Sequence, residues 1–170
     1  MTVRSGYSQA VGQEETAAVS PDGRAQASEL RLSYVIARLD RAVRRAIEDC
    51  IGPLGLTIPQ FTTLSVLLRR SGLSNAQLAR RSYITPQSMH DVVLELERRG
   101  LVRRKPDPAH RKILRTTLTA EGRRVVTCCE VAVAAMEDRM LADLAPEARE
   151  GLIHELAVCI HTLGAGLPEL

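Results

Sequence analysis

The sequence predicts a mostly α-helical protein with one small β-hairpin. Aromatic residues make up only 2% of the 170 residues and Trp is absent, and an abundance of Leu, Ala and Arg favours helices over a β-sandwich. Apolar residues recur every three or four positions over most of the chain, whereas two short central segments alternate as strands do. A 45% share of hydrophobic residues suffices for one packed domain of this length.

The N-terminal part of the chain contains two different segments. Residues 1–27 are rich in Gly, Ser, Gln, Ala and Glu without periodicity, which predicts a flexible tail. Residues 28–56 are predicted to form one long amphipathic helix that ends near the sequence IGPLG. Its apolar positions are Leu32, Val35, Ile36, Leu39, Ala42, Val43, Ala46, Ile47 and Cys50.

Three shorter helices begin with the same signal: an N-cap residue directly follows one apolar residue, and a second apolar residue stands four positions after the cap. Thr57 caps the first helix with Gln60 as its capping-box partner, and Ser74 caps the second with Gln77. Thr85 caps the third, which opens on a proline. Only about four residues, SYIT, separate the second helix from the third, so the sequence predicts a helix, a tight turn and a helix.

The third helix has one apolar and one polar face. Because each helical residue turns by ~100°, its core-facing residues are Met89, Val92, Val93 and Leu96. Those pointing away are Gln87, Asp91, Leu94 and Arg98, with Ser88 and His90 on the flanks. Short hydrogen-bonding side chains at a helix start are suited to reading base edges, and the helix N-terminus attracts phosphate. We therefore predict base contacts from Gln87, Ser88, His90 and Asp91, and a phosphate positioned by Thr85 and the helix start.

A basic hairpin follows this helix. Gly100 suits a left-handed C-cap, after which the segments LVRRK and KILRTTLT alternate as strands around the turn PDPAHR. The basic residues that surround its tip are Arg103, Arg104, Lys105, Arg111, Lys112 and Arg115. Thr119 then caps the first of two C-terminal helices, predicted over residues 119–142 and 146–163.

Charge is segregated along the chain. From Arg69 to Arg115 there are twelve Lys and Arg against four Asp and Glu, a net charge of +8, whereas the remainder has eleven against sixteen, or −5. Such a division is the expected electrostatic signature of a module that binds a polyanion. The helix-turn-helix and the hairpin, residues 57–118, are therefore predicted to bind duplex DNA.

The order of the segments GLTIPQFTTLSVL, LSNAQLARRSYITPQSM, LELERRGLVRRKPDPAHRK and LTAEG resembles the MarR family of winged helix-turn-helix transcriptional regulators. The resemblance covers about residues 28–163. It implies a homodimer formed by helix 28–56 and by the C-terminal helices within 119–170, and a palindromic operator. It also implies repression that is relieved by a small ligand or by thiol oxidation. Aromatic residues are few, and the sequence defines no residue set for a ligand pocket.

The hairpin departs from the family pattern at two positions. The family commonly has Asp and Arg nine and seven residues before the Thr of its Leu-Thr pair, where this chain has His110 and Lys112. Lys lacks the planar fork of Arg, and His does not hold it as a carboxylate does. We assign the groove contact of the wing to Arg111 and Lys112.

Other chemistries have little support in the sequence. There is no Gly-rich phosphate loop, nucleophile elbow, HExxH or CxxC motif, so we expect neither an enzyme nor a cofactor. Glu150, His154 and His161 are too loosely spaced to predict a metal site. Cys50, Cys128 and Cys159 lie in apolar helical patterns and are expected to be small buried hydrophobes.

The sequence also bears on location. Because there is no 18-residue apolar run and no apolar core near the N-terminus, we expect a cytoplasmic protein with reduced thiols and no membrane segment.

Two alternatives remain open. One is a winged helix that uses its basic hairpin on an acidic protein partner and does not read DNA. The other is a regulator that binds DNA but responds to thiol oxidation or to a metal.

Overall fold

A computed structural model describes residues 31–164 of the chain. The expected tail, residues 1–27, lies outside them. The chain divides into two compact units, Met1–Leu39 and Asp40–Leu170. Of the first unit, the described part includes only the start of the first helix. The helices are α2 (Leu32–Ile51), α3 (Ile58–Arg69), α4 (Asn75–Arg81), α5 (Pro86–Arg98), α6 (Ala120–Met140) and α7 (Pro146–Thr162), with a short 3₁₀ helix η1 (Gly52–Leu54) after α2.

Local capping sets the starts of α3, α4 and α6, as the sequence predicts. The backbone amide of Thr57 donates to Gln60 Oε1 at 3.1 Å, and that of Ser74 donates to Gln77 Oε1 at 2.9 Å. The amide of Gly122 donates to Thr119 Oγ1 at 2.9 Å at the start of α6. Each bond satisfies a backbone group that a helix end would leave unpaired.

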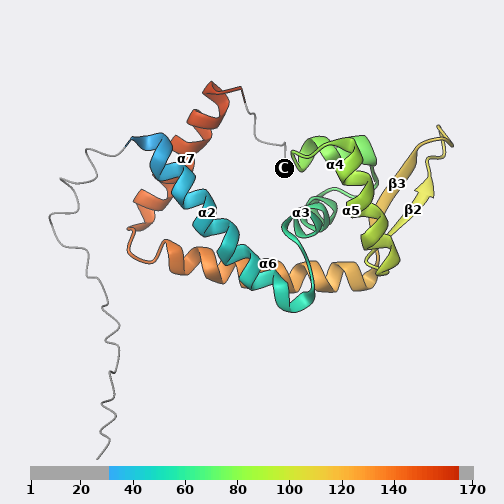
Figure 1. Cartoon of the computed structure of the whole chain (residues 1–170), viewed down its shortest axis with the longest axis horizontal. Helices are drawn as coiled ribbons and strands as arrows, with labels where there is room; N and C mark the ends of the chain where they lie inside the picture. The colour runs from blue at the N-terminus through green and yellow to red at the C-terminus, as the bar shows by residue number, and fades with distance from the viewer. Residues whose placement is uncertain (1–30, 165–170) are drawn as a thin grey trace, which may run out of the picture. The chain divides into compact units, whose positions relative to one another are not determined.

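The sheet has three strands rather than the two that the sequence predicts. Strands β2 (Val102–Pro106) and β3 (Leu114–Leu118) form the expected antiparallel hairpin, which extends beside α5 (Figure 1). The two-residue strand β1 (Leu73–Ser74) pairs with β3, which gives the order β1-β3-β2. A strand of two residues shows no alternation, and Ser74 also caps α4, so the sequence pattern indicated only the helix.

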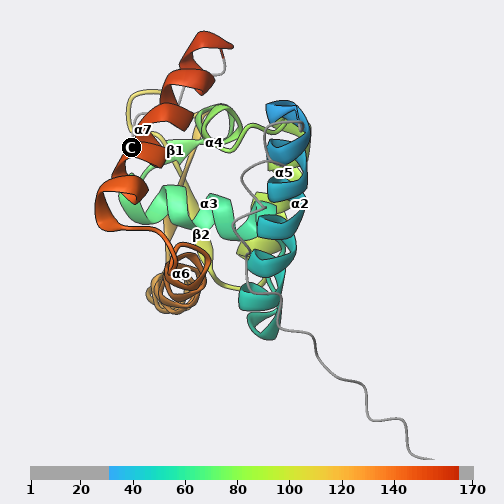
Figure 2. The same ribbon diagram turned by 90° about the vertical axis from the view of Figure 1, so that its left-hand side faces the viewer.

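The core of the second unit is built around α3. This helix contacts α4 on one side and α6 on the other (Figure 2), and it also packs against α5 and β3. Fully buried residues of these elements include Leu64, Leu67, Leu78, Met89 and Val126. The sheet covers one edge of this core and therefore lies next to both helices of the helix-turn-helix.

The expectation for the cysteines is wrong in two of three cases. Cys50 is partly buried, but Cys128 and Cys159 are exposed, and the buried thiol is Cys129. The buried face of α6 includes Val125, Val126, Cys129, Val133 and Met136, whereas α7 has no buried residue. Burial raises the pKa of the Cys129 thiol, with smaller contributions from Cys128 and Cys50. A raised pKa disfavours the thiolate and so argues against Cys129 as a redox sensor.

No single helix in the described part of the chain is long and apolar enough to cross a membrane. The segments Leu32–Leu54 and Ile58–Arg69 reach the required length and composition only as a pair, with an 80° bend between them. The second of these segments contributes Leu64 and Leu67 to the core.

The closest backbone approach in the core predicts a sensitive position. A Cβ at Gly122 would overlap the backbone carbonyl of Leu101. Gly122→Ala should therefore lower the free energy of unfolding by about 1–3 kcal/mol, as overpacking does. Urea unfolding would measure this change. Gly151→Ala, on α7 with no atom within 4 Å of the added Cβ, is the matched control and should be neutral or slightly stabilising; equal losses of stability in both variants would contradict the prediction.

Candidate nucleic-acid interface

The start of α5 is held by contacts on both sides of its first turn. Thr85 Oγ1 accepts the backbone amide of Ser88 at 3.1 Å and lies 2.9 Å from the Ser88 hydroxyl. Asn75 Nδ2, at the start of α4, donates to the carbonyl of Pro86 at 2.8 Å. The two helices of the helix-turn-helix are therefore tied together at the end where α5 begins.

The turn between α4 and α5 is unusually tight. Tyr83 has a φ of 53°, the only positive value at a non-glycine residue among those described. Residues other than glycine rarely adopt a positive φ, because their Cβ then comes too close to the neighbouring backbone. The amide of Ile84 donates to the carbonyl of Ala79 at 3.2 Å and closes the turn. This geometry directs α5 away from α4 within four residues.

Burial of one face of α5 fixes which side chains point outward. Met89, Val93 and Leu96 are buried, and Val92 is half-buried, as predicted. The exposed residues in its opening turns and cap are Thr85, Gln87, Ser88, His90 and Asp91. Leu94 and Arg98 are also exposed, and Arg98 pairs with Glu95 at 2.7 Å.

Five of the seven candidate residues thus lie together on the cap and first turns of α5. Thr85 and Ser88 hydrogen-bond to each other, so both hydroxyls already serve the helix cap. The other two candidates, Arg111 and Lys112, are exposed in the loop between β2 and β3. They form no ion pair with any residue from 31 to 164. The interface therefore has two parts, a polar helix start and a basic loop.

Two of the six basic hairpin residues are structural rather than available at the tip. Arg104, on β2, donates through Nε to Glu97 Oε2 at 2.8 Å, and Glu97 Oε1 accepts its backbone amide at 3.2 Å. The side-chain hydrogen bond from Arg104 lowers the pKa of Glu97. This pair fastens β2 to the C-terminal part of α5.

The second structural arginine is Arg115, on β3. Its Nε donates to Asp107 Oδ2, and its Nη1 donates to Gln77 Oε1 at 2.9 Å. Gln77 is the capping-box partner of Ser74, so Arg115 connects the hairpin loop to the start of α4. The exposed basic residues of the hairpin are consequently reduced to Arg103, Lys105, Arg111 and Lys112.

Asp107 is a functional candidate that lies outside the residues that the sequence assigns to the interface. Its side chain is only 10% exposed, and Oδ1 accepts the backbone amides of Ala109 at 2.8 Å and His110 at 3.1 Å. The hydrogen bond from Arg115, followed by that from Ala109, lowers the pKa of Asp107. An acidic residue between two prolines in a basic loop was the available signal, but its partner Arg115 lies eight residues away.

The described residues contain no group of three or more His, Cys, Asp or Glu side chains placed to hold a metal ion. Glu150, His154 and His161 of α7 are exposed and form no such group.

Comparison with known proteins identifies the fold family. Residues 54–113 match the family model described as "MarR family". Over 125 residues the chain is 39% identical to the HTH-type transcriptional repressor Rv2887 of Mycobacterium tuberculosis, a match that covers 73% of this chain and 90% of that protein. The chain belongs to the MarR family.

Solved structures of the same relative agree with this assignment. The Mycobacterium tuberculosis Rv2887 complex with DNA has a TM-score of 0.63 and 34% identity, and the match covers 75% of this chain and 96% of that one. The Rv2887 complex with salicylic acid has a TM-score of 0.62 and 35% identity, covering 76% and 96%. This MarR protein is therefore a winged helix-turn-helix transcriptional regulator, as the sequence predicts, and is not an enzyme.

The lowered pKa of Asp107 predicts how stability depends on pH. The carboxylate contributes stability that is present above its unfolded pKa, near 3.8, and is lost as the pH falls through the lower folded value. Asp107→Asn should therefore be less stable than the wild type at neutral pH. The difference should shrink as the pH falls below the ordinary value. Urea unfolding from pH 7 to pH 3 measures this difference, and a gap that stays constant with pH would contradict it.

Proposed function

We propose that the protein is a homodimeric repressor that binds a palindromic operator and is released by a small ligand. The observation that carries this proposal is the pairing of two exposed features on one scaffold. The first turns of α5 present Gln87, His90 and Asp91, and the loop between β2 and β3 presents Arg111 and Lys112, which form no ion pair with any residue from 31 to 164. A helix in the major groove with a basic wing beside it is a known docking geometry for DNA.

Each part of the interface has a distinct role in this proposal. Gln87 suits adenine and Asp91 accepts from cytosine N4, while Ser88 and His90 contact neighbouring base edges. Thr85 and the helix start hold a phosphate. Arg111 and Lys112 contact the backbone or the minor groove, where cations give affinity and salt dependence more than sequence preference.

Exposed apolar residues on α2 and on α7 support the homodimer. On α7, Ile153 is 66% exposed, and Leu152 and Val158 are also exposed. Separately, the start of α2 exposes Leu32, at 64%, together with Val35, Ile36 and Leu39. Exposed apolar residues of this kind are suited to a protein partner, and a second copy of the chain is the partner that we propose. Two-fold symmetry would then place the operator half-sites about one helical turn, ~10 bp, apart.

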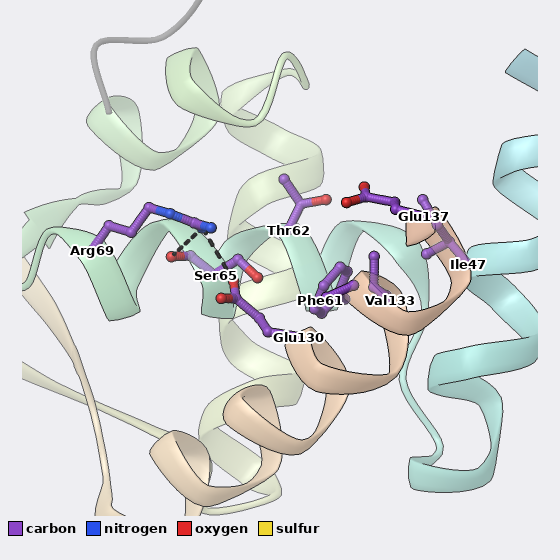
Figure 3. A pocket seen from close by; sticks show the side chains of 9 residues that line it. Ile47, Phe61, Thr62, Ser65, Arg69, Glu130, Val133 and Glu137 are labelled. Carbon is purple, nitrogen blue, oxygen red and sulfur yellow. Dashed lines mark hydrogen bonds and ion pairs between the residues drawn. The ribbon is translucent and has the colours of Figure 1, made fainter. Parts of the chain in front are cut away.

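A cavity among α2, α3 and α6 is the proposed ligand site (Figure 3). Its volume is about 390 Å³, large enough for one small aromatic molecule. Ile47, Phe61 and Val133 supply apolar surface. The polar residues that line it are Thr62, Ser65, Arg69, Glu130 and Glu137.

The polar lining supports a carboxylic acid as the ligand. Arg69 Nη1 donates to Glu130 Oε1 at 3.1 Å and to the Ser65 carbonyl at 3.4 Å, as Figure 3 shows. Ser65 Oγ is buried without a hydrogen-bond partner among the described residues. A ligand carboxylate would compete with Glu130 for Arg69 and give the Ser65 hydroxyl an acceptor. The relative Rv2887 has been solved with salicylic acid, which makes salicylate a suitable probe.

The proposal is tested by selecting random duplex DNA with the purified protein at near-physiological salt. Enrichment of a palindrome with half-sites one turn apart would support the dimeric regulator. Absence of any enriched sequence would rule out specific recognition by the unliganded protein and would favour the acidic-protein-partner alternative.

The assignment of base contacts gives a prediction on that operator. Gln87→Ala and His90→Ala should each relax preference at particular base pairs and weaken binding to the best site by ~1–3 kcal/mol. Arg111→Gln is the contrast, because removing a cation that binds phosphate weakens binding to all sequences alike. Competition assays over single-base operator variants measure both. A uniform weakening by Gln87→Ala would assign Gln87 to the backbone instead.

Competition between the ligand and Glu130 gives a second prediction. Arg69→Met should weaken salicylate binding roughly tenfold or more, because it removes a charge-assisted hydrogen bond. Glu130→Gln should strengthen it, because Arg69 is released. Titration calorimetry measures both changes. Glu137→Gln is the matched control, since it removes a charge from the same cavity without releasing Arg69; an equal increase in affinity in both Gln variants would mean that only net charge matters.

A further inference from the structure

The loop that carries Arg111 and Lys112 is closed mainly by a single acidic residue. Four hydrogen bonds within the loop close it, and Asp107 takes part in three. Its carboxylate accepts the amides of Ala109 and His110, and its own amide donates to the carbonyl of Ile113 at 2.7 Å. The fourth bond runs from the amide of Ile113 to the carbonyl of His110, also at 2.7 Å. The two cations lie between the residues that these bonds fix.

Arg115 connects this closed loop to the helix-turn-helix. It donates to Asp107 on one side and to Gln77 on the other, and its Nη1 also lies 3.4 Å from the carbonyl of Gly72. Its backbone pairs with Ser74 across strands β1 and β3. A planar guanidinium can bind these partners together, whereas an ammonium group cannot span the same fork.

We propose that Asp107 and Arg115 are positioning residues for DNA binding, which hold the wing loop so that Arg111 and Lys112 reach the DNA backbone. The inference rests on the proposed function, because it assumes that the wing contacts DNA. Its distinctive consequence is that a negative charge in the wing strengthens binding to a polyanion. Asp107 acts through the loop that it closes, and Arg115 acts through Asp107 and Gln77.

Simple electrostatics predicts the opposite for Asp107. A carboxylate near the DNA repels phosphate, so its removal would strengthen binding if it had no positioning role. Because the side chain is mostly buried and paired with Arg115, its repulsion of DNA is already largely neutralised. The sign of the change therefore separates positioning from a direct charge effect.

The experiment measures operator affinity for four variants of the full chain over a range of salt concentrations. Asp107→Asn retains an oxygen for the loop amides but removes the charge that holds Arg115. Arg115→Lys retains the charge but removes the fork. The double variant tests whether the two act as one unit. Glu121→Gln is the matched control, since it removes the carboxylate of an exposed ion pair with Arg124 on α6.

We expect both single variants to bind the operator roughly tenfold more weakly, as when about one charge-assisted hydrogen bond to DNA is removed. The slope of log affinity against log salt should fall by ~0.9 for each phosphate that the wing no longer neutralises. Base preference should stay unchanged, since α5 is not altered. The double variant should bind no more weakly than the weaker single variant, and Glu121→Gln should bind as well as the wild type or slightly better.

Each contrary result has a definite meaning. Equal or tighter binding by Asp107→Asn would overturn the inference, and so would wild-type binding by Arg115→Lys or additive effects in the double variant. If the wild type itself enriches no operator, the proposed function fails first. Urea unfolding reports whether each variant folds, and Arg115→Lys alone decides the question if Asp107→Asn does not fold.

Discussion

The one-sided burial of α5 is the constraint on which the interface depends. Met89, Val93 and Leu96 are buried in the core, and with ~100° between successive residues this leaves no freedom in the direction of the remaining side chains. Gln87, His90 and Asp91 are exposed as a consequence, not as a separate feature. The cap on Thr85 and the bond from Asn75 then fix where the exposed face begins. The directions of these candidate side chains are therefore fixed by buried residues that are not themselves part of the candidate interface.

Features set within a few residues could be predicted from the sequence. The caps on Thr57, Ser74, Thr85 and Thr119 join groups three residues apart, and the left-handed Gly100 follows from its place after a helix. The exposed face of α5 could be predicted because helical geometry alone relates its residues. Candidate side chains in the interface were accessible to sequence reasoning for the same reason.

Features that depend on partners far along the chain could not be predicted. Strand β1 forms because Leu73 pairs with Thr116, which follows the helix-turn-helix in the sequence. Arg104 and Arg115 look like Arg103 and Arg111 in the sequence, yet they are fastened to Glu97 and Asp107. The side chains of Arg104 and Arg115 are only 19% and 35% exposed, and a charge withdrawn from water is costly unless it is paired. A count of charged residues treats all of these arginines alike, and only the fold shows which of them are paired within the protein and which are exposed.

Helix α3 links the proposed ligand cavity to α5. Ser65 and Arg69 line the cavity, while Thr63, on the same helix, contacts α5, with its Oγ1 3.6 Å from Met89 Sδ. Because close-packed interiors transmit strain, we expect a movement of α3 to reach α5, against which it packs. A ligand that gives the buried Ser65 hydroxyl an acceptor would stabilise only the state that it binds, and this difference in affinity would be the largest shift in DNA binding that this hydrogen bond could supply.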